Sequence, residues 1–250
     1  MLLLANRLVS GIVKAAYIAK KDAKLYYFKW PNITFGLFLP AIIYIAFSLG
    51  RSPEIASTLP GLVAMAGLFG AGAILSVALP LERAKGTFDR LRAAPVSLTT
   101  IVVGKTLGGF FFGTVLSTVY SLIVIPFSGV VLVNPVVFAF GIVLSSFTFS
   151  ALGACMSAPF GDVPEAMPPA TLIRVLMVFL GGVLLPVTAM PGFLQFIAFL
   201  LPITYAVDLI RQGLAIQIAT QMLLLDIAIL IAFAVSFLGL AVLILKRTLH

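Results

Sequence analysis

The sequence predicts an all-α membrane protein with six transmembrane helices, and three observations lead to this fold class. Hydrophobic residues make up 62% of the 250 residues and charged residues 10%, whereas soluble globular chains contain about 45–50% and about 25% of these classes. Apolar runs long enough to cross a bilayer recur along the chain. The basic residues, which give a formal net charge of +8, gather beside these runs. Membrane topology therefore explains the charge, and we expect no nucleic-acid partner.

An α-helix needs about 20 apolar residues to cross a hydrocarbon core of about 30 Å. The runs that approach this length cover residues 33–50, 57–80, 101–126, 136–158, 172–188 and 223–245. Six spans place both termini on one side of the membrane. Lys and Arg accumulate in the N-terminal segment, after the second run and at the C-terminus, while Arg51 and Arg211 occupy the opposite connections. We therefore expect both termini and the loop around Lys85 to be cytoplasmic.

Residues 1–30 predict a cytoplasmic amphipathic helix that precedes the permease domain, residues 31–250. At 100° per residue, apolar positions such as Ile12, Ala15 and Ala19 share one arc, and basic positions such as Lys14 and Lys21 share the other. Such a helix can lie on the cytoplasmic leaflet with its basic face on anionic headgroups, or it can dock against a partner subunit. Both interpretations are open at this point.

Residues 190–217 predict a re-entrant helical hairpin on the outer side, between the fifth and sixth spans. Pro191 and Pro202 enclose an apolar run, which includes Phe193 and is about half as long as a span. A seventh span would place the basic C-terminus outside, against the charge rule. The hairpin is a candidate outer gate. Within it, the i, i+3 spacing of Asp208 and Arg211 predicts an ion pair that is at least partly exposed.

The connection between the second and third spans, residues 81–95, predicts a short amphipathic helix bracketed by Pro80 and Pro95. Phe88 and Leu91 share an apolar face, and Arg90 and Arg92 add charge. This helix can lie on the bilayer or insert into a cytoplasmic partner. In the second case Phe88 and Leu91 are the expected anchors and the two arginines the rim, while Glu82 orders the start of the helix.

Small and hydroxyl-bearing residues occur at helical spacing inside the spans. The pairs Gly104/Gly108 and Gly109/Gly113 favour close helix packing. Hydroxyls share one face of the third span and one face of the fourth, where they can join helices or line a substrate route. These hydroxyl-bearing residues are Thr114, Ser117, Thr118, Ser121, Ser145 and Thr148.

Catalysis and metal binding are not expected from this chain. Gly104-Lys105-Thr106 resembles the end of a phosphate-binding loop, but Thr99 stands where the first glycine is required. The one histidine is the terminal His250, and the one cysteine, Cys155, has no partner. Asp226, in the first turn of the last span, is interpreted as an end residue that reaches water. We therefore expect no catalytic residue, no metal and no cofactor in this chain.

Two blocks of residues resemble the type-2 ABC exporter permeases, the group of multidrug, polysaccharide and lipo-oligosaccharide exporters. The first runs from Glu82-Arg-Ala-Lys-Gly86-Thr through Leu91 and Ala94-Pro95-Val-Ser to Gly104-Lys105, and is similar to an E-x-x-x-G-T…L…P-[VL]-S…G-K pattern. The second runs from Gly181 to Pro191 and continues through Pro202 and Tyr205 to Asp208 and Arg211. It resembles the end of the fifth span and the outer re-entrant helices.

The resemblance implies a half-transporter in the cell membrane, made of two permease copies, two separate ATPase subunits and surrounding lipids. ATP and Mg would be bound by the ATPases. The segment from Glu82 through Gly86 to Pro95 would be the coupling helix, and Tyr205 would belong to the gate. Such a complex would export a hydrophobic or amphipathic substrate such as a drug, a lipid-linked glycan or a polysaccharide. Two other classes stay open: a channel or secondary carrier that depends on Asp226, and a membrane scaffold.

Overall fold

The computed structural model describes residues 2–27, 30–48 and 55–248, and every regular element in these ranges is a helix. Arg51 and His250 lie outside the described residues, as does the end of the first predicted span at Gly50. The chain begins with α1 (Leu2–Asp22), a π-helical turn η1 (Ala23–Tyr27) and α2 (Trp30–Ser48). The apolar part of α2, Gly36–Ala46, is shorter than a full span.

Within the described residues, five helical segments are long and apolar enough to cross a membrane. A sixth span is present if α9 and α10, which meet at 86°, are counted together. The expectation of a helical multi-pass membrane protein is thus confirmed. The long helices are α3 (Ile55–Gly67) continued by the π-helical turn η2 (Leu68–Gly72) and α4 (Ala73–Ala84), then α6 (Leu98–Ser128), α7 (Pro135–Ser157), α8 (Val163–Leu180) and α11 (Thr220–Thr248).

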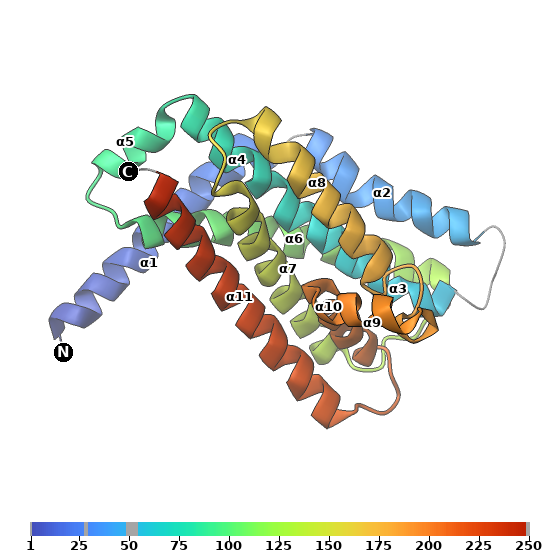
Figure 1. Ribbon diagram of the computed structural model, residues 1–250. Helices are drawn as coiled ribbons and strands as arrows, with labels where there is room; N and C mark the ends of the chain where they lie inside the picture. The colour runs from blue at the N-terminus through green and yellow to red at the C-terminus, as the bar shows by residue number, and fades with distance from the viewer. Residues whose placement is uncertain (1, 28–29, 49–54, 249–250) are drawn as a thin grey trace.

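The short elements lie at the two ends of this bundle. Helix α5 (Thr87–Ala93) lies at the same end as the C-terminus, whereas α9 (Gly192–Phe199) and α10 (Pro202–Gln212) lie at the opposite end (Figure 1). A single 3-10 turn, η3 (Val187–Ala189), precedes α9. Ile18 of α1, Phe88 of α5 and Leu245 of α11 share one apolar cluster, which places all three elements together.

Two predicted boundaries are wrong. The fifth helix covers 163–180 rather than 172–188, because the Asp162 side chain accepts a hydrogen bond from the Glu165 backbone N–H and caps an earlier start. Pro164 fits the first turn, where no N–H is needed. Pro80 does not bracket the connecting segment, because α4 continues through it to Ala84.

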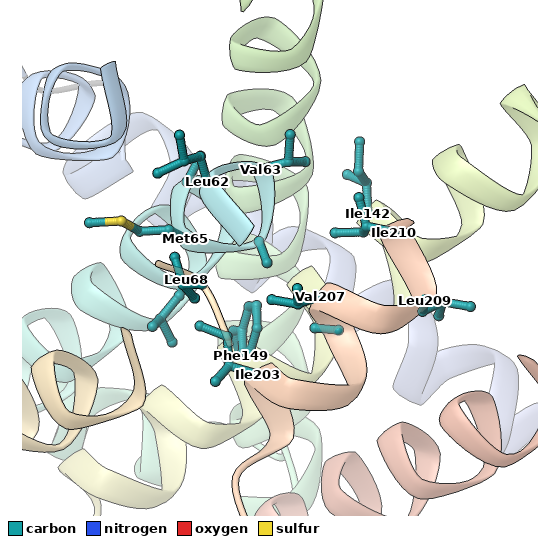
Figure 2. Packing of buried hydrophobic residues seen from close by; sticks show 14 of the residues in the cluster. Leu62, Val63, Met65, Leu68, Ile142, Phe149, Ile203, Val207, Leu209 and Ile210 are labelled. Carbon is teal, nitrogen blue, oxygen red and sulfur yellow. The ribbon is translucent and has the colours of Figure 1, made fainter. Parts of the chain in front are cut away.

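The largest apolar core lies between α3, α7 and α10, as Figure 2 shows. Leu62, Val63 and Met65 of α3 belong to the same cluster as Ile142 and Phe149 of α7. In Figure 2, Ile142 lies beside Ile210, and Phe149 lies beside Ile203. Helix α10 adds one whole face to this core, although it is only 11 residues long. That face consists of Ile203, Val207, Leu209 and Ile210, each at most 1% exposed. Helix α10 is therefore seated inside the bundle.

Glycines let α6 approach its neighbours closely, as the small-residue spacing predicts. A Cβ atom on Gly104 would lie 2.8 Å from the backbone oxygen of Ala15 in α1. A Cβ atom on Gly113 would lie 2.6 Å from Cβ of Ala71 and 3.0 Å from its backbone nitrogen. The packing role of these glycines is confirmed.

We predict that Gly113→Ala lowers the free energy of unfolding by about 1–3 kcal/mol, because the added methyl overpacks against backbone that cannot retreat. The matched control is Gly239→Ala in α11, where nothing lies within 4 Å of the added Cβ, and it should be neutral or stabilising. Unfolding by sodium dodecyl sulfate in bicelles measures both. Equal stability of the two variants would refute the close-packing argument.

Candidate functional site

Four alternating charges form a compact ion network, defined as Lys21, Asp22, Glu82 and Lys105. Lys105 Nζ lies 2.6 Å from Glu82 Oε2 and 3.1 Å from Asp22 Oδ2. Lys21 Nζ lies 2.6 Å from Glu82 Oε1 and 3.0 Å from Asp22 Oδ1. Three of the four side chains are at most 2% exposed, and Lys21 is 37% exposed. Two positive and two negative charges neutralise one another out of water.

The network joins the end of α1, the end of α4 and the beginning of α6. Glu82 stands in the last turn of α4, so its predicted role at the start of the connecting helix is wrong. Its carboxylate instead holds two lysines from other helices. Burial acts to lower the pKa of Lys21, but the bonds and charges of Glu82 and Asp22 outweigh it and raise that pKa. The contribution of Lys21 to stability is thus complete below its ordinary pKa and is lost only above it.

Helix α5 is seated by Phe88, which is 1% exposed. Gly86 has a φ of 66°, a left-handed conformation that glycine adopts easily, and it separates α4 from α5. Phe88 then packs with Leu79, Ile101 and others of its cluster. The prediction that Phe88 anchors a partner is therefore wrong, because its ring is buried against other residues of the same chain. An apolar helix face indicates that the face is covered. It does not indicate whether the same chain, a partner or lipid covers it.

The rest of the connecting segment carries exposed charge. Arg90 and Arg92 are exposed and Leu91 is half-buried. Asp89 Oδ1 lies 3.9 Å from Arg92 Nη1, a contact too long and too exposed to matter for stability. The Pro95 carbonyl accepts a hydrogen bond of 2.8 Å from Lys14 Nζ. Lys14 and Lys21 of α1 are thus used within the protein rather than on lipid headgroups.

The bent pair α9–α10 brings the predicted gate residues together. Pro191 immediately precedes α9 and Pro202 begins α10. The Tyr205 hydroxyl donates to the Phe199 carbonyl at 2.8 Å across the bend. Asp208 and Arg211 form the predicted half-exposed ion pair, which is confirmed, and both line a cavity of about 130 Å³ with residues of the α8–α9 connection. Phe193 is 69% exposed.

Two of the six span hydroxyls join neighbouring helices. Ser117 donates to the Val63 carbonyl of α3 at 3.1 Å, and Thr148 donates to the Leu230 carbonyl of α11 at 3.2 Å. Ser121 and Ser145 bond carbonyls of their own helices. Thr118 is exposed and Thr114 is half-buried. Thr118 is the position left for a substrate route, because the Thr114 Oγ1 atom is buried.

Two further charges lie inside the spans. Asp226 is 5% exposed and accepts a hydrogen bond of 3.0 Å from Gln212 Nε2, so the interpretation as a water-facing end residue is wrong. Arg174, placed at a span edge by the predicted boundary, is 4% exposed in the interior of α8.

Sequence reasoning missed Asp22 and gave Lys105 no structural role. Both had a visible signal. Asp22 is the one acidic residue in a lysine-rich segment, and Lys105 lies inside a long apolar run. Ionisable groups in such runs are expected to pair with one another.

A comparison with known protein families identifies the family of this chain. The model of the ABC-2 type transporter family matches residues 12–215, which include α5, the ion network and the bent pair. The chain belongs to this family. It is 26% identical over 158 residues to the probable multidrug ABC transporter permease YbhR of Escherichia coli, and 29% identical over 185 residues to the inner membrane transport permease YadH of the same species. The matches cover 61% and 71% of this chain, but 42% of YbhR and 69% of YadH.

We predict that Glu82→Gln destabilises this ABC-2 chain by about 3–5 kcal/mol, because it leaves a buried excess of positive charge. The double variant Glu82→Gln/Lys105→Met removes one charge of each sign and should lose less than the single variant. Asp89→Asn is the control for an exposed acid nearby, with an expected loss of about 0–1 kcal/mol. Detergent-titrated unfolding measures all three. A double variant less stable than Glu82→Gln would contradict charge compensation.

Proposed function

We propose that the chain is the permease subunit of an ATP-driven exporter in the cell membrane. In this proposal two copies pair, and two cytoplasmic ATPase subunits that bind ATP and Mg attach beneath them. The observation that carries the proposal is α5, a short helix with an exposed basic surface, Arg90 and Arg92, that is fixed to two spans in a chain of the ABC-2 type transporter family. A separate motor needs such a rigid contact to act on spans.

The proposed orientation places α5 and both termini in the cytoplasm and the α9–α10 bend on the outer side. Lysines and arginines concentrate near the end of the bundle that carries α5 and the C-terminus, including Lys85, Arg90, Arg92, Lys246 and Arg247. The charge rule assigns that end to the cytoplasm. In this arrangement α1 is an interfacial helix docked on α6, and its exposed residues Ile12 and Tyr17 face lipid.

Motion of α5 would reach the spans by two routes. One is the short chain link through Gly86 to α4, whose Arg83 donates to the carbonyls of Ala158 and Phe160 at 2.9 and 2.7 Å. The other is the ion network, which ties α4 to α1 and α6. Because both contacts are charge-assisted, they resist separation more than neutral bonds would.

The α9–α10 pair is proposed as a re-entrant outer gate. Helix α10 is locked in the core, whereas α9 buries Ala198 alone among its residues and exposes Phe193, Phe196 and Phe199. Opening would therefore move α9 about the bend at Pro202. Thr118, whose side chain is exposed, remains a proposed contributor to the substrate route. The name of YbhR favours a drug-like substrate over a polymer.

The decisive experiment is co-purification of the chain with an ATPase encoded beside it, followed by ATP hydrolysis in lipid vesicles with candidate substrates. Stimulated hydrolysis with outward transport is expected. Transport that continues with a hydrolysis-deficient ATPase, and stops in Asp226→Asn, would support the secondary carrier instead.

We predict that Arg90→Glu/Arg92→Glu weakens ATPase binding at least about tenfold, because rim charges that meet an acidic surface become repulsive. Folding should be unaffected, since both side chains are exposed. The control Lys246→Glu makes the same type of change at an exposed site at the same end of the bundle. Surface plasmon resonance on nanodisc-embedded protein gives the dissociation constants. Unchanged binding by the double variant would remove α5 as the contact.

Crosslinking is predicted to separate gating from assembly. Cysteines replace Phe193 of α9 and the exposed Phe179 of α8 in a Cys155→Ser background, and bifunctional maleimides of graded length join them. Export should stop while permease pairing and ATPase binding persist, because α9 can no longer move. The same reagents on each single-cysteine variant are the control. Full export by the crosslinked protein would refute the gate.

A further inference from the structure

Arg174 is a buried cation that no acid within the described chain neutralises. It lies in the second half of the 18-residue helix α8, opposite the middle of the span Ser57–Ala84. None of the ion pairs in the described residues includes it. An ionised group at this depth is costly and is found where it meets a partner, a substrate or an ion.

The hydrogen-bond partners of Arg174 among the described residues are neutral. Nη1 donates to the Gly72 carbonyl at 3.2 Å and to Ser76 Oγ at 3.0 Å, and Nη2 donates to Thr171 Oγ1 at 3.3 Å. The buried Nε has no partner among the described residues. Neutral acceptors orient the guanidinium but leave its charge uncompensated. The fork of N–H donors suits a carboxylate or phosphate in two-point contact.

An apolar cavity lies beside Arg174 on the same helix pair. It has a volume of about 200 Å³ and is lined by Val175, Val178 and Phe179 of α8, by Met65 and Phe69 at the α3–η2 junction, and by residues of α2. Val178 is four residues beyond Arg174, so both lie on one face of α8. On the opposing span, Phe69 is three residues before Gly72, whose carbonyl bonds Arg174. The backbone positions of Arg174 and of its acceptor Gly72 therefore lie one helical turn from the cavity lining, and the guanidinium extends one further turn, toward Thr171.

We propose that Arg174 and this cavity form a binding site for an anionic amphiphile, with the anion on Arg174 and one apolar tail in the cavity. The volume is below the roughly 300–1,000 Å³ of sites that enclose drug-sized ligands, which favours one tail over the two chains of a phospholipid. The anion would replace neutral acceptors with a charged one and so neutralise the guanidinium. This assignment of substrate class rests on the export function proposed above.

The head of such a ligand would enter past Thr171, which is exposed and already bonds Nη2. Val175 and Phe179 follow Thr171 on the same side of α8 and are also exposed and apolar. An amphiphile that moves along this side of α8 stays in apolar surroundings until its anion meets the guanidinium. Loss of the Thr171 bond would free Nη2 for the incoming oxygen.

The test measures binding by the purified full chain in phosphatidylcholine nanodiscs, with no ATPase present. The probes are radiolabelled decanoic acid and its methyl ester, corrected for partition into protein-free nanodiscs. The wild-type chain should bind the acid at least about tenfold more tightly than the ester. Arg174→Gln should abolish that preference, and Arg247→Gln, at an exposed site, should preserve it. Val175→Trp, which fills the cavity from a partly exposed position, should weaken both probes alike.

Equal binding of acid and ester by the wild-type chain would overturn the proposal. This result does not depend on whether Arg174→Gln folds, which size-exclusion chromatography reports separately. Unchanged binding by Val175→Trp would overturn the tail site. Displacement of the acid by anionic phosphatidylglycerol would assign the site to a bilayer lipid and overturn the substrate class. Because no ATPase takes part, these results are independent of whether the export function holds.

Discussion

Lys105 imposes the constraint on which much of this structure depends. An ammonium group 2% exposed inside a long apolar helix requires counter-charges that arrive from elsewhere in the chain. Asp22 and Glu82 supply them, and Lys21 balances the second negative charge. The carboxylates can reach Lys105 only if the end of α1 and the end of α4 converge on the first turns of α6. A set of charges therefore fixes the relative placement of three elements that apolar packing alone would leave free to slide.

Close backbone packing then makes the centre of the bundle stiff. Gly113 admits Ala71, and Gly153 admits the backbone of Gly72, whose oxygen would lie 2.6 Å from an added Cβ. The helices α6, α7 and the α3–η2–α4 span therefore move as one body or not at all. Mobility is left to the periphery, where α9 and the outer faces of α8 and α1 have few buried side chains.

Local features of this fold were predictable from sequence, and distant pairings were not. The Asp208–Arg211 pair follows from a spacing of three residues, and the proline positions set the bounds of α9 and the start of α10. Glu82 was misassigned because its partners stand 61 and 23 residues away in sequence, where no periodicity applies. Phe88 was assigned to a partner for the same reason. Its amphipathic pattern predicts a covered face, but the covering residues are distant in the sequence. The start of α8 was missed because a proline-rich segment suggests a loop unless its capping aspartate is recognised.

The π-helical turn Leu68–Gly72 makes the length of the second span as important as its composition. Such turns arise when one residue is inserted into an α-helix, and each residue of an α-helix turns the chain by about 100°. A chain that lost one residue between Gly67 and Ala73 would keep its hydropathy and still cross the membrane. Helix α4 would nevertheless rotate relative to α3, and Ser76 and Glu82 would turn away from Arg174 and Lys105. The number of residues in this turn therefore sets the rotational register between the outer and the inner half of the span.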